Sequence, residues 1–318
     1  MANKSKKRAR KNKKRARALM AALLAAMLMG SLCIFVRESG CSAQACSLAR
    51  FGIGFLIIGS IAIIRRLRGR GRLSFSPASF ASGVSIGLCI LFYFLAIQYT
   101  SAAIAALLPA TGPLLSAVWE SLLEKRLPPR RDVLLLLTAG LGIVIVATYS
   151  PHNTPGHDDA QGILYGILCG LCYSFYLVLN RCMSAEVQMM QRLFWQSAAG
   201  ALVLLIPLYL GGADALQGLS SGWPWLIGIG VLQGVGVLAL VAYAMRHLTS
   251  LEFGIISCLE PTEATLIGRA VYAEAILPGQ WPGFLLVLIT IISKSQRHLG
   301  WKMRSLLARQ SGRRRVRA

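Results

Sequence analysis

The chain has 318 residues, of which 55% are hydrophobic and only 14% are charged, and its formal net charge is +22. A soluble protein of this length spreads its charge over the surface. Here the charge is confined to short segments between apolar runs of about 18–22 residues, the length that crosses a bilayer as a helix. The composition therefore argues against a soluble domain and predicts an all-α polytopic membrane protein.

The N-terminal segment is strongly basic, with ten Lys or Arg residues between Lys4 and Arg17. Such a block before an apolar run is typical of a cytoplasmic anchor that lies against anionic lipid. Nucleic-acid binding would need aromatic platforms or a domain, and neither follows. Residues 18–36 with the motif Ala43-Gln44-Ala45 resemble a signal peptide, but the run is long for one. We interpret it as a retained first helix.

Ten apolar segments follow one another along the chain, with ends uncertain by several residues. They are residues 18–36, 46–64, 78–98, 102–122, 132–149, 161–179, 193–210, 223–243, 251–271 and 280–295. With the N-terminus inside, all of the 34 Lys and Arg residues except Arg37, Arg50 and Arg269 lie on the inner side, as the positive-inside rule requires. We therefore expect ten transmembrane helices in the cell membrane, with both termini cytoplasmic.

An internal repeat divides these ten segments into two sets of five. AIQYTSAAIAALLPATGP (96–113) aligns without a gap on AMRHLTSLEFGIISCLEP (244–261). An odd number of spans per half makes the repeats inverted in the membrane, an architecture of carriers. The predicted domains are a basic tail (1–17), a first five-helix repeat (18–150), an outer linker (151–160), a second five-helix repeat (161–296) and a second basic tail (297–318).

Several stretches together resemble the EamA type of the drug/metabolite transporter superfamily. They are GSLCIFVRES (30–39), SLARFGIGFLI (47–57), the stretch 96–127 and LEPTEATLIGRAVYAEAI (259–276). The resemblance implies a secondary carrier with a central cavity, often an exporter. The chain departs from the family at Gly112, where a carboxylate matching Glu260 is missing, and at Glu124-Lys125, which is offset from the position that Glu274 predicts.

Two prolines are expected to break the fourth and ninth helices. Pro261 has no amide hydrogen to pair with the Ser257 carbonyl, and Pro113 has none for the Pro109 carbonyl. Unpaired backbone at membrane depth is tolerated where it lines a cavity or finds protein partners. Both breaks therefore predict the transport path.

Glu260 lies near the middle of the ninth helix, and Glu263 is one turn further on. A carboxylate at that depth costs about 3 kcal/mol on insertion scales. A proton, a cationic substrate group or hydrogen-bond donors at the break would compensate this cost. The alternative is that Glu260 only satisfies backbone amides or pairs with a neighbouring helix.

Charged residues also lie near the predicted helix ends. Opposite signs at similar depth predict either an ion-pair gate or ordinary interfacial snorkelling. The outer candidates are Arg37, Glu38, Arg50, Arg269 and Glu274, and the inner ones are Glu120, Glu124 and Arg192.

Aromatic and amide side chains within the spans are candidates for the lining of a cavity, or else for packing and the interfacial belt. They are Tyr93, Gln98, Tyr173, Tyr176, Trp195, Gln196 and Gln233. Glycines at small-xxx-small spacing, such as Gly162, Gly166 and Gly170, predict close helix packing.

No cofactor or metal is expected from the sequence. The pair Cys169-x-x-Cys172 lies in an apolar span without a second pair, which argues against a metal site. Whether Cys41 and Cys46 form a disulfide is open. No phosphate-binding loop of the Walker type occurs, so ATP is not the expected energy source.

The sequence thus predicts a secondary active transporter, not an enzyme, whose partners are a small-molecule substrate and the lipid bilayer, without nucleic acid. The expected substrate is a small organic metabolite, such as an amino acid or a related compound, that is exported by alternating access. A channel is the alternative, followed by an intramembrane enzyme. Substrate identity, direction, coupling ion and oligomeric state are left open by the sequence.

Overall fold

The computed structural model describes residues 2–69, 74–125, 127, 130–149, 159–183, 189–245, 256, 259–274, 277–286, 288–290 and 293. Within these residues every regular element is a helix and no strand occurs. The C-terminal basic tail, most of the outer linker and Ser257 lie outside the described residues.

The first half of the chain forms helices that match the first five expected spans, and its fourth span is broken. Its elements are α1 (Ala2–Gly30), α2 (Leu32–Glu38), α3 (Ala43–Leu67), α4 (Pro77–Tyr99), α5 (Ala102–Leu107), the 3-10 helix η1 (Pro109–Thr111), α6 (Gly112–Leu123) and α7 (Arg130–Thr148). Serine side chains fix three of the starts, because Ser42, Ser76 and Ser101 accept hydrogen bonds from backbone N–H groups in the first turns of α3, α4 and α5.

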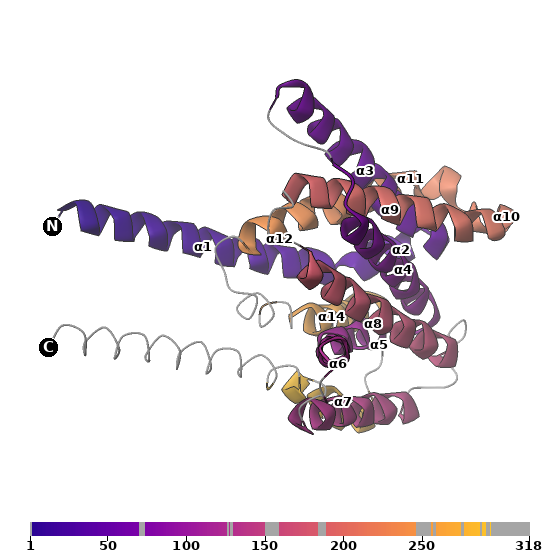
Figure 1. Ribbon diagram of the computed structural model, residues 1–318. Coiled ribbons are helices and arrows are strands. Elements are labelled where there is room, and N and C mark those ends of the chain that lie inside the picture. Colours follow the sequence, from indigo (N-terminus) through magenta and orange to yellow (C-terminus); the bar gives the residue numbers. More distant parts are fainter. Residues whose placement is uncertain are drawn as a thin grey trace, which may run out of the picture.

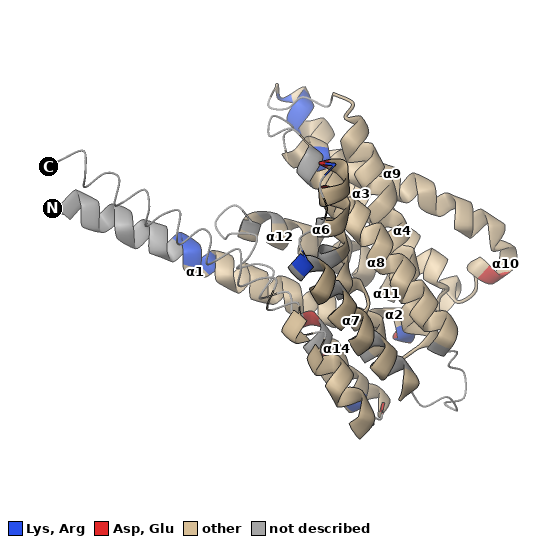
Figure 2. Cartoon of the chain, turned by 60° about the horizontal axis from the view of Figure 1, so that its bottom comes forward, with Lys and Arg blue, Asp and Glu red and all other residues tan. Residues whose placement is uncertain are grey.

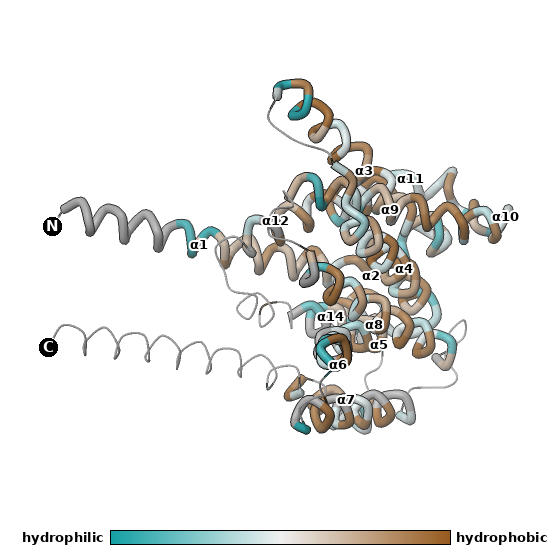
Figure 3. Tube along the Cα trace, viewed as in Figure 1, coloured by the Kyte–Doolittle hydropathy of each residue, from teal (hydrophilic) through white to brown (hydrophobic). Residues whose placement is uncertain are grey.

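The second half begins with two long helices and continues with shorter ones. Its elements are α8 (Asp159–Cys182), α9 (Met189–Leu210), α10 (Gly212–Ala215), α11 (Leu219–Gly228), the π-helix η2 (Ile229–Gly236), α12 (Val237–Met245), α14 (Leu259–Tyr272) and the 3-10 helix η3 (Pro278–Gln280). α11, η2 and α12 run on from one another. In the described part of the chain, six helical stretches are long and apolar enough to cross a membrane, and Figure 3 shows the hydrophobic residues along them.

Helices from the two halves of the chain are intermixed in space (Figure 1). α4 packs against α8 and α9, and α3 packs against α9 and η2. α1 packs against α12 and α14, and α14 also contacts α5. The core between them is apolar and includes the fully buried Phe94, Leu32, Ile97, Leu204 and Ile229.

Glycines make the closest of these contacts possible. A methyl group added to Gly166 of α8 would meet the side chain of Leu108, and one added to Gly170 would lie 3.1 Å from Oγ1 of Thr111. Gly54 of α3 and Gly234 of η2 face each other in the same way. Small residues let helix backbones approach in a membrane protein. The glycine ridges are therefore packing surfaces, as the sequence predicted.

Candidate functional site

An ion pair joins the two halves of the sequence at one end of the bundle. Nη1 of Arg37 in α2 donates to Oε1 of Glu274, just after α14, at 2.5 Å. Nη2 of Arg37 also donates to the carbonyl oxygens of Thr100 and Ile97, at 2.9 and 3.3 Å. The backbone N–H of Ala102, the first residue of α5, donates to the Glu274 carboxylate at 3.1 Å. The cation thus lies at the carbonyl end of α4 and the anion at the amide end of α5, which favours both charges.

Two further residues complete this cluster. The Arg37 guanidinium lies 4.7 Å from the centre of the Tyr272 ring, in cation–π geometry. The Tyr272 hydroxyl donates to Oε1 of Glu38 at 3.2 Å. We call Arg37, Glu38, Thr100, Tyr272 and Glu274 the outer junction, after the outer position that the sequence predicts for Arg37, Glu38 and Glu274. The sequence missed Tyr272, for which its position two residues before Glu274 was the only signal.

The predicted outer gate is assembled only in part. Arg37, Glu38 and Glu274 meet in the outer junction, whereas Arg269 is exposed in the last turn of α14. Arg50 was expected at the outer end of its helix, and this prediction is wrong. α3 already begins at Ala43, so that Arg50 lies two turns inside a helix of membrane-spanning length.

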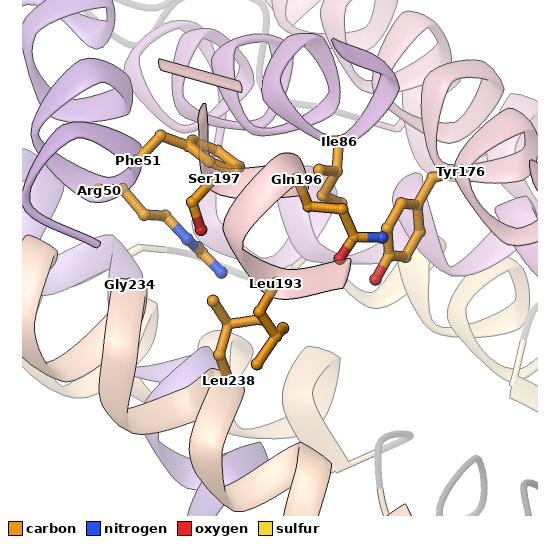
Figure 4. Close-up of a pocket in the computed structure, with 9 residues that line it drawn as sticks. All are labelled: Arg50, Phe51, Ile86, Tyr176, Leu193, Gln196, Ser197, Gly234 and Leu238. Atoms are coloured by element: carbon orange, nitrogen blue, oxygen red, sulfur yellow. The ribbon is translucent and has the colours of Figure 1, made fainter. Parts of the chain in front are cut away.

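Arg50 instead lines an internal pocket. About 420 Å³ of space lies in and at the mouth of this pocket, open solvent included, so that its enclosed part is smaller. Figure 4 shows its lining, with Arg50 reaching from α3 toward the α9 residues Leu193 and Ser197 and with Tyr176 of α8 beside Gln196. The lining residues are Arg50, Phe51, Ile86, Tyr176, Leu193, Gln196, Ser197, Gly234 and Leu238.

The polar residues around this pocket are held in place by their neighbours. The Gln196 amide donates to Oγ of Ser82 at 2.8 Å and to Oδ1 of Asn180 at 3.0 Å. Tyr176 stacks on Tyr173, with ring centres 6.0 Å apart and nearly parallel planes. Of the predicted cavity residues, Tyr176 and Gln196 therefore line the pocket and Tyr173 supports it.

Glu260 lies inside the helical bundle, in the region of Arg50 and Tyr93. The Tyr93 hydroxyl lies 3.5 Å from its Oε1, a long hydrogen bond. Arg50 is close enough to Glu260 for their charges to interact. Glu263, one turn on, packs against Gly30 of α1, where an added methyl group would lie 2.6 Å from its Oε2. The structure thus brings Arg50, Tyr93 and Glu260 into one region and places Glu263 against α1.

The fourth span is broken where the sequence predicted, but its backbone is not left unpaired. The Gly112 N–H donates to the Pro109 carbonyl, which Pro113 was expected to leave without a partner. The Leu108 carbonyl accepts from the Thr111 N–H and hydroxyl, at 3.1 and 2.8 Å. The tighter 3-10 turn of η1 supplies these bonds. The unpaired Pro109 carbonyl is therefore a wrong prediction.

The ninth span is described from Leu259 onward, as α14, and Pro261 is the third residue of this stretch. The predicted unpaired carbonyl of Ser257 lies outside the described residues.

Two amide side chains join helices and do not line the pocket. Gln98 donates to the Cys41 carbonyl at 2.9 Å. Gln233 is fully buried in η2 and donates to the Leu28 carbonyl of α1, while its Oε1 has no partner among the described residues. Neither residue is in the pocket that the structure defines.

Cys41 and Cys46 are both free thiols. Burial raises the pKa of the Cys41 thiol, which lies in the turn between α2 and α3. A protonated thiol can donate a hydrogen bond, and Sγ of Cys41 lies 3.3 Å from the Gly218 carbonyl.

The inner candidates Glu120 and Glu124 lie at the end of α6, half-buried and exposed, respectively. No group of three or more metal-ligating side chains occurs in the described residues.

Apolar helices of membrane-spanning length around a charged internal pocket define the class, that of polytopic membrane transport proteins. Two stretches of the sequence, residues 16–148 and 160–293, match the EamA-like transporter family. The chain belongs to this family, as the sequence predicted, and to its class of membrane transporters.

Curated relatives fit this assignment. The chain is 28% identical over 274 residues to an uncharacterized transporter of Archaeoglobus fulgidus, covering 86% of this chain and 94% of the relative. It is 27% identical over 218 residues to the threonine/homoserine exporter RhtA of Escherichia coli, covering 67% of this chain and 68% of RhtA. A solved crystal structure with a TM-score of 0.57 and 17% identity covers 88% of this chain and 98% of its own, a likeness of fold alone.

Proposed function

We propose that the chain is a secondary transporter that exports a small organic metabolite, an amino acid or a related compound, by alternating access. One observation carries the proposal. The pocket at Arg50 is lined by helices from both halves of the chain, whereas the outer junction holds the two halves together at one end of the bundle. A binding site between two halves that separate at alternate ends is what a carrier requires.

The packing of the helices supports two inverted repeats of five. α4 packs on α8 in the way that α12 packs on α1, and α4 packs on α9 in the way that α3 packs on η2. The contact of α6 with α8 likewise corresponds to that of α14 with α1. The two matches to the family divide the chain at nearly the same place as the predicted repeats 18–150 and 161–296. In this proposal the chain has ten spans.

The orientation follows from the distribution of charge. In Figure 2 one group of basic residues lies along α1 and another at the end of α3, away from α2, while single basic residues lie elsewhere. The proposal places these ends and both termini on the cytoplasmic side, where anionic lipid attracts Lys and Arg. The outer junction then closes the exterior end, so this conformation corresponds to an inward-facing carrier.

Glu260 is the proposed proton site of the cycle. It is a carboxylate at membrane depth beside Tyr93, in reach of the charge of Arg50. Intramembrane carboxylates commonly relay protons in transporters. Export driven by proton entry would alternate protonation of Glu260 with occupation of the pocket. The name of the relative RhtA, an exporter of threonine and homoserine, supports the amino-acid class and the direction.

Counterflow in proteoliposomes tests the proposal. Purified protein is reconstituted with a high internal concentration of unlabelled L-threonine, and the uptake of trace labelled L-threonine is followed. The carrier should show transient accumulation of label above equilibrium. The same assay with other amino acids defines the substrate class. A flux that never exceeds equilibrium for any of them, and does not saturate, would indicate a channel.

A further inference from the structure

We infer that the pocket at Arg50 binds the carboxylate group of an organic acid, and that Arg50 is the residue that selects acids over neutral or cationic compounds. The inference rests on the proposed function, because it assigns a chemical class to the substrate of the same pocket. The different surroundings of Arg37 and Arg50 in this chain support it, without reference to any relative.

The N–H donors of Arg50 are not bonded to any described residue. A guanidinium carries five N–H donors and is not deprotonated in proteins. Arg37 shows how this chain accommodates such a group, with one carboxylate and two carbonyl oxygens accepting from it. Arg50 has no hydrogen bond or ion pair to any described residue, although it lies inside a membrane span. Its donors therefore face the pocket without an acceptor among the described residues.

Glu260 does not take the place of that acceptor. It is near enough for its charge to be felt by Arg50, yet its hydrogen-bond contact is with the Tyr93 hydroxyl. A ligand that enters the pocket can thus approach Arg50 directly. A carboxylate matches the guanidinium with two parallel hydrogen bonds, the strongest arrangement open to it.

The remaining lining limits the kind of acid. Among the described lining residues Arg50 is the one cation, which suits one negative charge better than the two of a phosphate ester. Much of the remaining lining is apolar and accepts a small hydrocarbon body, with polar groups at Ser197, Gln196 and Tyr176. The apolar lining residues are Phe51, Ile86, Leu193 and Leu238.

The backbone around Arg50 is fixed before any ligand binds. Gly234 of η2 lies against the Arg50 carbonyl oxygen, so closely that an added methyl group would overlap it. Across the pocket, Gln196 is fixed by its bonds to Ser82 and Asn180. A binding group that is already positioned loses less entropy when it binds, which favours affinity.

A thermal-shift screen with matched compounds tests the inference on the full-length protein in detergent. Each metabolite acid is tested beside the alcohol in which its carboxylate is reduced, for example L-threonine with L-threoninol, and 3-hydroxybutyrate serves as an acid without an amine. The acids should raise the melting temperature and their alcohols should not. Arg50→Gln should weaken acid binding by about tenfold to a hundredfold, and Arg50→Lys should weaken it less.

Arg65→Gln is the matched control, because Arg65 is exposed near the end of the same helix. It should leave the binding of acids unchanged. Should Arg50→Gln lower the melting temperature of the free protein, Arg50→Lys, which keeps the charge and loses the two parallel bonds, carries the comparison. Three results would overturn the inference. They are equal shifts of the melting temperature with acids and with their alcohols, no shift with any of the acids, and unchanged affinity for acids in both Arg50 variants.

These experiments distinguish a failure of the inference about Arg50 from a failure of the proposed transport function. Acids that bind through Arg50 but show no counterflow would leave the inference standing and contradict the carrier. Counterflow of compounds without a carboxylate, unaffected by Arg50→Gln, would do the reverse.

Discussion

Arg37 and Arg50 carry the same charge into the helical bundle and meet different surroundings. Arg37 donates to Glu274 and to the carbonyl oxygens of Thr100 and Ile97, and its side chain is 15% exposed. Arg50 faces a pocket and donates to no described residue. A group whose donors are bonded to the protein holds structure together, whereas donors that meet no described acceptor are available to a ligand.

Charge exchange tests the outer junction. Arg37→Glu should lower the free energy of unfolding by about 1–3 kcal/mol, because it places a carboxylate against helix carbonyls and against Glu274. Combining Arg37→Glu with Glu274→Arg restores a pair of opposite charges. It still places an anion at the carbonyl end of α4 and a cation at the amide end of α5, which is unfavourable at both ends. The double variant should therefore recover only part of the loss, as measured by thermal unfolding in detergent. Full recovery would mean that the helix ends contribute nothing.

Glu260→Gln tests the proton role. Glutamine keeps the shape and the hydrogen bonding of a neutral carboxyl group and cannot titrate. Net transport driven by a proton gradient should fail, whereas exchange of substrate for substrate, which needs no net proton movement, should survive. Both fluxes are measured in proteoliposomes with an imposed pH gradient.

Asp214→Asn is the control for this experiment, because Asp214 is an exposed acid in α10. It should leave both fluxes unchanged. Retention of pH-driven accumulation by Glu260→Gln would make Glu260 a structural partner of Tyr93. Loss of exchange as well would indicate that the carboxylate binds the substrate.

At the scale of elements, glycine contacts decide how closely the helices approach. Gly83 of α4 lies on the backbone of α9, and an added methyl group would lie 2.7 Å from Cα of Gln196. Backbone cannot move aside as a side-chain tip can. Gly83→Ala should therefore lower the free energy of unfolding by about 1–3 kcal/mol.

Gly52→Ala on α3 provides the comparison, because no atom lies within 4 Å of a methyl group added there. It should be neutral or stabilise by up to about 1 kcal/mol, since alanine favours the helix over glycine. Thermal unfolding of both variants in one detergent measures the difference. Equal effects of the two substitutions would show that the contact of α4 with α9 tolerates an added methyl group.

The sequence predicted the helices better than their interruptions. Apolar length and proline positions located the spans and the break near Pro113, because both depend on local chemistry. They did not reveal the 3-10 turn that satisfies the Pro109 carbonyl, or the π-helix at Ile229–Gly236. These depend on contacts between helices, such as that of Gly234 with α3, which no local pattern encodes.

The candidate site, like the fold, was predictable from the sequence only in part. Opposite charges near helix ends indicated Arg37, Glu38 and Glu274, because few other partners are available to a charge in a membrane. Arg50 was misplaced because the start of α3 was set three residues too late, at 46 in place of Ala43. That shift sufficed to count a pocket residue among the outer candidates. Which residue faces a cavity depends on helix rotation, which the sequence does not specify.

At the scale of the whole molecule, the packing of each helix of one half on the other half explains why neither half makes the pocket alone. α3 and α4 supply Arg50 and Ile86, and helices of the second half supply Tyr176 and Gln196. Motion of the halves relative to each other would change the pocket and the outer junction together. Opening of one end and closing of the other would then be coupled by geometry.

The ten-span arrangement makes a prediction about the sides of the membrane. An even number of spans with a cytoplasmic N-terminus places the C-terminus in the cytoplasm, and five spans before residue 154 place that residue outside. Alkaline phosphatase, which is active only outside, should be inactive when fused after Ala318 and active when inserted at Thr154, and green fluorescent protein should give the opposite pattern. Inversion of the whole pattern would contradict the assignment from the positive charges but preserve the count of spans. Finding both positions on the same side would exclude two inverted repeats of five, because an inverted repeat needs an odd number of crossings in each half.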